Sequence, residues 1–241
     1  MVESAIILAG GRGTRLSSIF PNTPKPLVKF HGRPFIDWVI LWLIKNSIKE
    51  VIVSTGYLGD KIELHLSNFK NKKIKIKCIR EPKILGTAGG ALYSLSMSNV
   101  KSKDVLIVNG DTLSTANLIQ DGDSNSIKLW AYNHHDSSRY GTLKVDSNNY
   151  LKGFKEKVSG KGLINGGIYS FPVDLLSEFK VKKQSFEEDI FPQLIKKNIS
   201  IKVQILDSDF IDIGTVSSYN NSNLFIRRHT NYFEDLLKYE M

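Results

Sequence analysis

The chain has 241 residues, of which 41% are hydrophobic, so it can bury a sizeable core as one large α/β domain or as two small ones. Its 33 basic and 24 acidic residues give a net charge of +9, which suits an anionic partner. The lysines are scattered and no aromatic residues interleave with them in a nucleic-acid-binding motif, so the composition favours phosphorylated small molecules and no nucleic acid.

A short buried strand is predicted at Ala5–Ala9, and it breaks directly into a loop with glycines at positions 10, 11 and 13. Such a loop can adopt positive φ and expose backbone N–H groups, which is how a loop cradles phosphate. Arg12, Arg15 and Lys25 add cationic charge to the same stretch. The pattern favours a triphosphate ligand, whereas a tight strand-to-helix turn with solvated arginines would explain the glycines without any ligand.

The loop differs from two other phosphate-binding glycine motifs. No Gly-Lys-Ser/Thr closes it as in a Walker loop, and Leu16 stands where Gly-x-Gly-x-x-Gly needs its last glycine. Residues 10–16 and 24–26 instead resemble the Gly-Gly-x-Gly-Thr-Arg-Leu…Pro-Lys-Pro signature of the sugar-phosphate nucleotidyltransferases, which load a sugar 1-phosphate onto a nucleotide. The resemblance implies that Arg15 and Lys25 are catalytic, and that the nucleotide lies on Leu8, Gly10, Gly11, Gly13, Thr14 and Arg15.

Helices and strands alternate in the next part of the chain. Phe35–Lys45 is apolar almost all round, with Pro34 where a first helical residue would stand, and predicts a helix buried against a sheet. A strand, a short helix and an edge strand of alternating lysine and isoleucine follow at Glu50–Thr55, Gly59–Leu66 and Lys72–Ile79. This order predicts an α/β fold, a Rossmann-like three-layer sandwich with a mostly parallel central sheet, whose ligands bind beyond the carboxyl ends of the strands.

No segment of the sequence predicts a contact with membranes. The longest apolar stretch, Phe35–Ile44, is far below the roughly 20 residues that span a bilayer. The first residues carry no basic leader, and their apolar run is short. Cys78 is the only cysteine, which rules out an intrachain disulfide and a cysteine-based zinc cluster. These features predict a cytoplasmic protein that binds no membrane.

Small residues in Glu81–Ala91 would let a flat base approach the backbone where a helix opens from Thr87 onward. Close packing of a helix on a strand explains the glycines at 89 and 90 as well. Leu85-Gly86-Thr87 is similar to the segment with which the nucleotidyltransferase family holds the base, so Gly86 and Thr87 are assigned to the nucleotide. Glu81 can accept the paired donors of a guanine edge, although family members that use uridine nucleotides also have a glutamate nearby.

Two aspartates are candidates to bind Mg²⁺, the cofactor that the resemblance implies. Val105–Thr112 is an apolar strand with Asp111 near its carboxyl end, where such sheets bind ligands; the alternative is an aspartate that caps the next turn. Asp212 lies between two isoleucines, where a carboxylate is costly unless a cation or donors compensate it. Its segment matches the family's Asp-Ile/Val-Gly-Thr, which carries the second metal ligand. Mg²⁺ needs only one or two carboxylates besides substrate phosphates.

The second half of the chain is predicted to hold the sugar. Arg139–Asp146 and Tyr150–Lys157 predict a hairpin, which would form a small antiparallel sugar-binding region. The second strand resembles the family's Phe-x-Glu-Lys segment, which implies that Glu156 binds sugar hydroxyls and Lys157 a phosphate; a surface charge pair is the alternative. The resemblance also places three more residues in the sugar pocket, Gly141, Asn165 and Gly167, although a β-bulge would explain the paired glycines.

Residues 1–225 are predicted to form a single nucleotidyltransferase domain, with a nucleotide half at about 1–125 and a sugar half at about 126–225. Ser185 and Glu188 predict a capping box, and the acidic residues 187–189 are interpreted as structural. From Val216 the chain is predicted to be helical, and residues 226–241 form a C-terminal extension. Its apolar side would pack on the body or pair with another subunit, which leaves a homo-oligomer open.

The order and spacing of the later motifs resemble most closely the bacterial D-glycero-α-D-manno-heptose 1-phosphate guanylyltransferases. The implied partners are a nucleoside triphosphate, GTP, and that sugar 1-phosphate, and the implied reaction releases pyrophosphate. A uridylyl-, cytidylyl- or thymidylyltransferase of hexose or N-acetylated sugar 1-phosphates is the alternative, ahead of a nucleotide-sugar-dependent glycosyltransferase or a non-catalytic nucleotide sensor. Gly-Thr-Arg-Leu and Pro-Lys-Pro count against the glycosyltransferase, and a sensor should have lost Lys25 or an aspartate.

Overall fold

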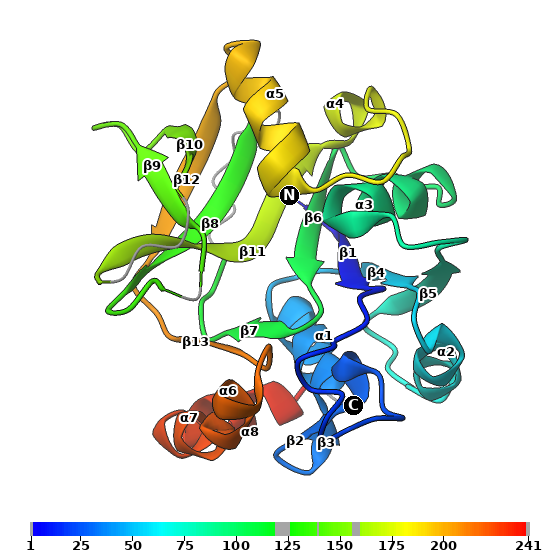
Figure 1. The fold of residues 1–241 in the computed structure, drawn as a ribbon. Helices are drawn as coiled ribbons and strands as arrows, with labels where there is room; N and C mark the ends of the chain where they lie inside the picture. Colours follow the sequence, from blue (N-terminus) through cyan, green and yellow to red (C-terminus); the bar gives the residue numbers. More distant parts are fainter. Residues whose placement is uncertain (1, 119–125, 139, 156–159, 240–241) are drawn as a thin grey trace.

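Four parallel strands form the half of the sheet that carries the glycine loop. The computed structural model describes residues 2–118, 126–138, 140–155 and 160–239 (Figure 1). In spatial order the parallel strands are β6 (Asp104–Asn109), β1 (Ser4–Ala9), β4 (Glu50–Thr55) and β5 (Lys75–Arg80). Ala9 lies beside Thr55 and Leu8 beside Asn109, so the carboxyl ends of the three inner strands reach a common edge. The lysine-rich β5 lies at the end of the sheet, as predicted, although it begins only at Lys75.

The other half of the same sheet is mainly antiparallel. β11 (Gly162–Pro172) runs antiparallel to β6 and thereby joins the two halves. The rest of this half consists of β8 (Ile127–His134), β9 (Thr142–Val145), β10 (Leu151–Lys155) and β12 (Ile201–Leu206). β9 and β10 form the predicted hairpin, and β12 runs parallel to β8. The predicted α/β, Rossmann-like fold with an antiparallel region is confirmed.

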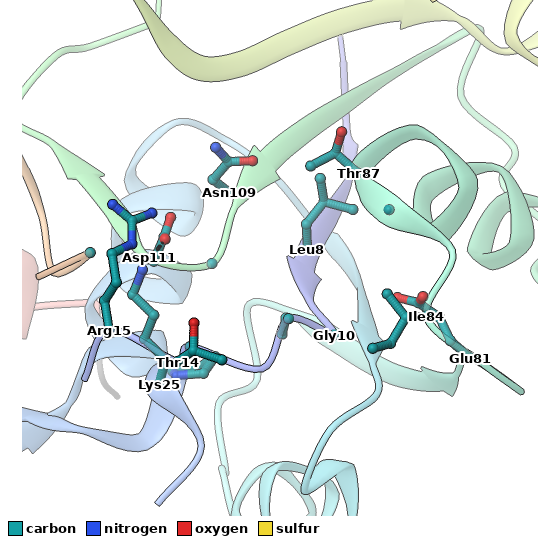
Figure 2. A pocket seen from close by; sticks show the side chains of 17 residues that line it. Leu8, Gly10, Thr14, Arg15, Lys25, Glu81, Ile84, Thr87, Asn109 and Asp111 are labelled. Atoms are coloured by element: carbon teal, nitrogen blue, oxygen red, sulfur yellow. Dashed lines mark hydrogen bonds and ion pairs between the residues drawn. The ribbon is translucent and has the colours of Figure 1, made fainter. Parts of the chain in front are cut away.

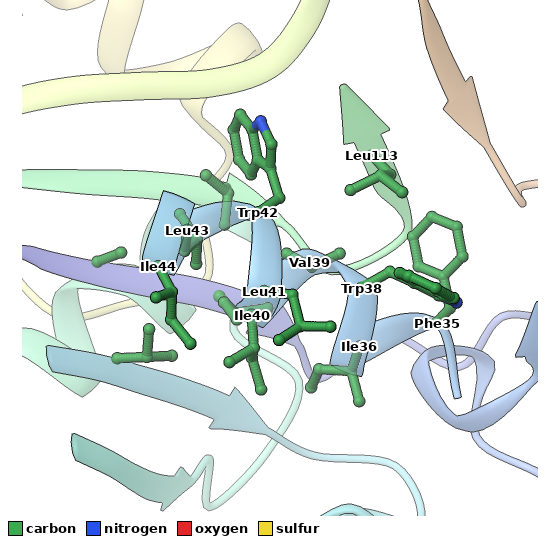
Figure 3. Packing of buried hydrophobic residues seen from close by; sticks show 14 of the residues in the cluster. Phe35, Ile36, Trp38, Val39, Ile40, Leu41, Trp42, Leu43, Ile44 and Leu113 are labelled. Carbon is green, nitrogen blue, oxygen red and sulfur yellow. The ribbon is translucent and has the colours of Figure 1, made fainter. Parts of the chain in front are cut away.

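Helices cover both faces of the sheet and complete the three layers. Alternate residues of β1 point to opposite faces, so Ala5 and Ile7 pack with α1 (Phe35–Lys45) while Ile6 packs with α3 (Gly86–Ser96). All of α1 from Phe35 to Ile44 is buried, as its nearly continuous apolar sequence predicted (Figure 3). The face opposite α1 is covered by α3 together with the aromatic residues that precede and begin α5 (Phe191–Lys196).

Three short helices end the described chain, where the sequence predicted continuous helix. They are α6 (Val216–Asn220), α7 (Ser222–Arg228) and α8 (Thr230–Leu237), which pack on one another in chain order, and α8 packs against α1 (Figure 1). Phe233 meets the ring of Trp38 edge-on, with 5.0 Å between the ring centroids. Phe233 and Leu236 are buried, whereas Leu237 is partly exposed. The apolar side of this extension therefore packs on the body of the same chain.

The remaining elements are short. They are the 3₁₀ turn η1 (Lys25–Leu27), β2 (Lys29–Phe30), β3 (Arg33–Pro34), α2 (Gly59–Ser67), β7 (Thr112–Ser114), α4 (Val173–Ser177), the π-helical turn η2 (Phe186–Ile190) and β13 (Phe210–Asp212). Pro34 ends β3 and precedes α1, so it is not the first helical residue. No helix within the described ranges is long and apolar enough to cross a membrane.

The predicted capping box at Ser185 is only half correct. The hydroxyl of Ser185 accepts a hydrogen bond from the backbone N–H of Glu188 at 2.9 Å, as predicted. The backbone N–H of Ser185, however, donates to the carboxylate of Asp189 at 2.7 Å, where a capping box would use Glu188. The turn that follows is π-helical and therefore wider than an α-turn, which places the returning carboxylate one residue later.

Two leucine truncations test the burial of α1. Leu41 is fully buried in α1, while Leu64 of α2 is 68% exposed. Leu41→Ala is expected to lower the free energy of unfolding by about 2–5 kcal/mol, because it leaves a cavity in a packed core. The matched control Leu64→Ala should change it by less than about 0.5 kcal/mol. Urea unfolding followed by circular dichroism measures both, and equal losses would contradict this packing.

The thiol of Cys78 is expected to be nearly inert at neutral pH. Cys78 is half-buried on β5, and desolvation together with the negative charge of Glu63 raises the pKa of its thiol to about 11. At pH 8 it should therefore carry about two hundred times less thiolate than a free cysteine of pKa about 8.5. The rate of reaction with a thiol reagent should rise about tenfold per pH unit up to pH 10. A rate that levels off below pH 10 would contradict this pKa.

Candidate active site

A pocket of about 340 Å³ opens where the carboxyl ends of β1 and β6 meet the amino-terminal end of α3 (Figure 2). All nine residues assigned to the nucleotide line this pocket, together with Lys25 and Asp111. Six lining residues were not assigned from the sequence: Ala9, Pro26, Ile84, Asn109, Gly110 and Gly214. The structure therefore brings the glycine loop, the Pro-Lys-Pro segment and the predicted base segment into one concave site.

The glycine loop turns sharply after β1 and is anchored by a buried leucine. Gly13 has φ +59°, a conformation that favours glycine, and a Cβ there would lie 3.1 Å from Cβ of Lys25. The backbone N–H of Leu16 donates to the carbonyl of Gly13 at 2.9 Å, and the Leu16 side chain is buried. Thr14 and Arg15 are left exposed on the pocket side of this turn (Figure 2). The loop thus presents backbone and cationic groups to a ligand.

Glu81 closes the opposite end of the pocket from Lys25 and Arg15 (Figure 2). One carboxylate oxygen accepts from the Ser54 hydroxyl at 2.9 Å, and the other accepts from the backbone N–H of Leu85 at 3.0 Å. Burial raises the pKa of Glu81, and these two hydrogen bonds oppose the rise. Because each carboxylate oxygen has a second lone pair, Glu81 holds the start of α3 to the sheet and can still accept a further hydrogen bond on the pocket side.

Lys25 supplies a cation at the floor of the pocket. Pro24 and Pro26 flank it, and the 3₁₀ turn is closed by the Leu27 N–H, which donates to the Pro24 carbonyl at 2.8 Å. The Lys25 ammonium forms an ion pair with the carboxylate of Asp111. The lysine side chain is only 12% exposed, so this pairing compensates the cost of burying its charge.

The second aspartate is held next to the first by the β7–β13 pair. Asp212 lies opposite Thr112 in the register, and the backbone N–H of Ile213 donates to the carbonyl of Asp111 at 3.0 Å. One oxygen of Asp212 accepts from the Gly214 N–H at 2.7 Å, and the other accepts from the hydroxyl of Tyr140. A Cβ on Gly214 would lie 2.5 Å from an oxygen of Asp212 and 3.6 Å from the Lys25 ammonium, so the second aspartate also lies near this cation.

Three of the five predicted sugar-binding residues can be placed. Asn165 and Gly167 lie on β11 at a β-bulge, so the alternative explanation of the paired glycines also holds. Gly167 has φ +67°, and a Cβ there would overlap the Asn109 amide, which lines the pocket. Gly141 precedes β9, and its carbonyl accepts from the Asn165 N–H at 3.4 Å. Glu156 and Lys157 lie outside the described residues.

The fold brings three further polar residues to this region that were not predicted from the sequence. Asn109 precedes Gly110-Asp111 at the end of β6, so its position at a strand end was a usable signal. Tyr140 lies within the predicted strand Arg139–Asp146 and was not singled out, yet its hydroxyl donates to Asp212. Glu187 contacts Asn165 from a segment that was interpreted as structural. Neither Tyr140 nor Glu187 has a local signal, because their partners are 72 and 22 residues away.

Comparison with known proteins places the chain among enzymes of nucleotide transfer. A family model described as Nucleotidyl transferase matches residues 4–229. The chain is 39% identical over 219 residues to D-glycero-alpha-D-manno-heptose 1-phosphate guanylyltransferase of Campylobacter jejuni subsp. jejuni serotype O:2, a match that covers 89% of this chain and 96% of that protein. It is 34% identical over 231 residues to the protein of the same name from Aneurinibacillus thermoaerophilus, with 90% and 96% covered.

The fold is similar to that of HddC from Yersinia pseudotuberculosis, whose structure is also known in complex with GMP-PN. The TM-score is 0.82 at 27% sequence identity, and the match covers 93% of this chain and 100% of HddC. The family match over nearly all of the chain confirms what the glycine loop and the Pro-Lys-Pro segment predicted. The chain belongs to the nucleotidyl transferase family.

Proposed function

We propose that the chain transfers GMP from GTP to D-glycero-α-D-manno-heptose 1-phosphate and releases pyrophosphate. The observation that carries this proposal is the pocket in which the glycine loop, Lys25 and Asp111 converge at the carboxyl edge of the parallel strands. The choice of sugar and base is supported by the names of the two relatives and by the GMP-PN complex of HddC. A GTP-consuming reaction suits the cytoplasm.

The proposed reaction is an in-line attack of a sugar 1-phosphate oxygen on the α-phosphorus of the nucleotide. Both reactants are anions, so the protein must mainly neutralise charge and hold the line of attack. The backbone N–H groups of the loop and Arg15 would hold the phosphates that leave as pyrophosphate, and Lys25 the α-phosphate. Glu81 lies at the far end of the same pocket, where the base would reach it. Asn165 and Gly167 would place the sugar on the side of β11.

The two aspartates fit a divalent cation. Both offer carboxylate oxygens, which hard cations such as Mg²⁺ prefer. Both also lie near the Lys25 ammonium, so this part of the site already accommodates a positive charge. The described residues contain no group of three or more His, Cys, Asp or Glu side chains that could hold a metal, so phosphate oxygens and water would complete the ligand set. Mg²⁺ bound there would supply positive charge to the reacting phosphates. If a bound phosphate draws the Lys25 ammonium away from Asp111, the Asp111 carboxylate loses its counter-charge. A divalent cation would then replace that charge.

The first test is pyrophosphate release with D-glycero-α-D-manno-heptose 1-phosphate and each of GTP, ATP, CTP, UTP and dTTP. Release is expected with GTP and Mg²⁺, and none in the presence of EDTA. Release with another triphosphate alone would contradict the guanine assignment, and turnover only with hexose 1-phosphates would contradict the heptose. Consumption of a nucleotide-sugar without pyrophosphate would identify a glycosyltransferase, and GTP binding without turnover of any sugar 1-phosphate would identify a sensor.

The role of the buried cation is tested by Lys25→Ala against Lys29→Ala. Lys29 is exposed and only four residues away, so its loss serves as a matched control of charge. Lys25→Ala is expected to lower kcat about 10²–10³-fold, because a positioned charge is removed from the reacting phosphates. Asp111→Asn should have a comparable effect, and Lys29→Ala almost none. Steady-state kinetics with unchanged circular dichroism spectra measures this; wild-type turnover in Lys25→Ala would refute its assigned role.

A further inference from the structure

The segment that leads into η2 is fastened to the predicted base segment. The backbone N–H of Gln184 donates to the carbonyl of Leu85 at 2.9 Å, and its own carbonyl accepts from the Gly89 N–H at 3.1 Å. A Cβ on Gly86 would lie 2.6 Å from that same carbonyl, so the approach is too close for any other residue. The Phe186 N–H donates to the Thr87 hydroxyl at 3.1 Å. Residues 184–186 therefore fix the position of Leu85-Gly86-Thr87.

The π-helical turn directs one of its acidic side chains inward. Glu188 is exposed, whereas one carboxylate oxygen of Glu187 accepts from the Asn165 amide at 3.1 Å and from the Tyr169 hydroxyl at 2.7 Å. Its other oxygen lies 3.4 Å from the hydroxyl of Thr87. A single carboxylate thus joins α3 on the nucleotide side to β11 on the sugar side. Turns of this type occur frequently at functional sites.

This contact determines which way the Asn165 amide points. A carboxylate can only accept hydrogen bonds, so the NH₂ group of Asn165 must face Glu187. That NH₂ group also donates to the Tyr169 oxygen at 2.8 Å, which uses both of its hydrogens. The amide oxygen accepts from the Gly167 N–H at 2.9 Å and keeps a second lone pair. Asn165 can therefore offer a sugar hydroxyl an acceptor, but no donor.

Tyr169 makes the arrangement rigid. Its side chain is fully buried, and its ring contacts those of Phe186 and Phe191, at centroid distances of 5.1 and 5.2 Å. Burial and the neighbouring Glu187 carboxylate raise the pKa of Tyr169 well above its usual value, so the hydroxyl stays protonated and donates to that carboxylate. A buried polar network in which each member is paired holds one geometry.

We propose that Glu187 is a positioning residue for the sugar 1-phosphate: it fixes the Asn165 amide so that its oxygen faces a sugar hydroxyl, and through Thr87 it ties this geometry to the base segment. The inference rests on the proposed function, because it takes Asn165 to bind the sugar. It assigns to Glu187 a role in substrate binding, whereas the adjacent acids, Glu188 and Asp189, lie outside the network.

Glu187→Ala and its neighbour Glu188→Ala test this role, since both remove one carboxylate from the same turn. Glu187→Ala is expected to raise the KM for D-glycero-α-D-manno-heptose 1-phosphate about 10- to 100-fold, the loss expected for a hydrogen bond to a charged group. The KM for GTP should stay within about threefold, and Glu188→Ala should leave both constants unchanged. Glu187→Gln keeps a carbonyl acceptor for Asn165 and Tyr169, and should restore the sugar KM to within about threefold of wild type.

Equal rises of both KM values in Glu187→Ala, or a Glu187→Gln variant as defective as Glu187→Ala, would overturn the inference in favour of a merely structural role. If Glu187→Ala does not fold, Glu187→Asp replaces it, because it withdraws the carboxylate by one methylene and keeps the charge. The sugar KM should then rise in the same direction, and an unchanged value would again overturn the inference.

A double-mutant cycle with Asn165→Ala shows whether Glu187 acts through Asn165. The double variant should have a sugar KM within about threefold of Asn165→Ala alone, because both changes remove the same interaction. Multiplied effects would overturn the inference. A wild-type chain that turns over no sugar 1-phosphate would refute the proposed function and this inference with it, whereas an active wild type with an unaffected Glu187→Ala would refute only the inference.

Discussion

The close approach of three strand ends is the constraint on which the pocket depends. The carbonyl of Gly10 accepts from the Tyr57 N–H at 3.3 Å, and that of Leu8 accepts from the Gly110 N–H at 3.0 Å. A Cβ on Gly56 would lie 2.7 Å from the Gly10 carbonyl, and one on Gly110 would lie equally close to that of Leu8. These contacts are too short for any side chain. Because glycine occupies both positions, the segments that follow β4 and β6 can pack directly against the end of β1. The loop after β1 is therefore held between them, at the pocket.

The pocket is also a place where unlike charges are kept in fixed positions. Lys25 is nearly buried and is held by Asp111, so its ammonium faces the ligand space without the freedom of a surface lysine. At the other end, Glu81 carries a carboxylate whose pKa is raised by burial. This separation gives the site a cationic end and an acceptor end, which the proposed function assigns to the phosphates and to the base. The continuous sheet keeps the two ends at a constant separation.

Contacts between distant segments could not be predicted. Glu187 stands in a run of acids, and only the π-helical turn directs it to Asn165 while Glu188 remains in solvent. Tyr140 reaches Asp212 because the turn before β9 lies across from β13, a relation that depends on the order of strands. The capping box, by contrast, was half correct, because the wide π-helical turn moved only the acceptor of the Ser185 N–H to Asp189. The partners of Glu187 and Tyr140 are chosen by the packing of segments that are distant in the sequence.

The sequence by itself determined the glycine loop, the buried helix Phe35–Lys45, the parallel strands and the family, because these signals are carried by neighbouring residues and by hydrophobic periodicity. It also supplied Asp111 and Asp212 as candidates, since a carboxylate at a strand end or among isoleucines is conspicuous. Only the tertiary structure decided that Lys25 pairs with Asp111, and that Asn165 is held by Glu187. Those pairings depend on which strands become neighbours in the sheet, and local propensity does not specify that order.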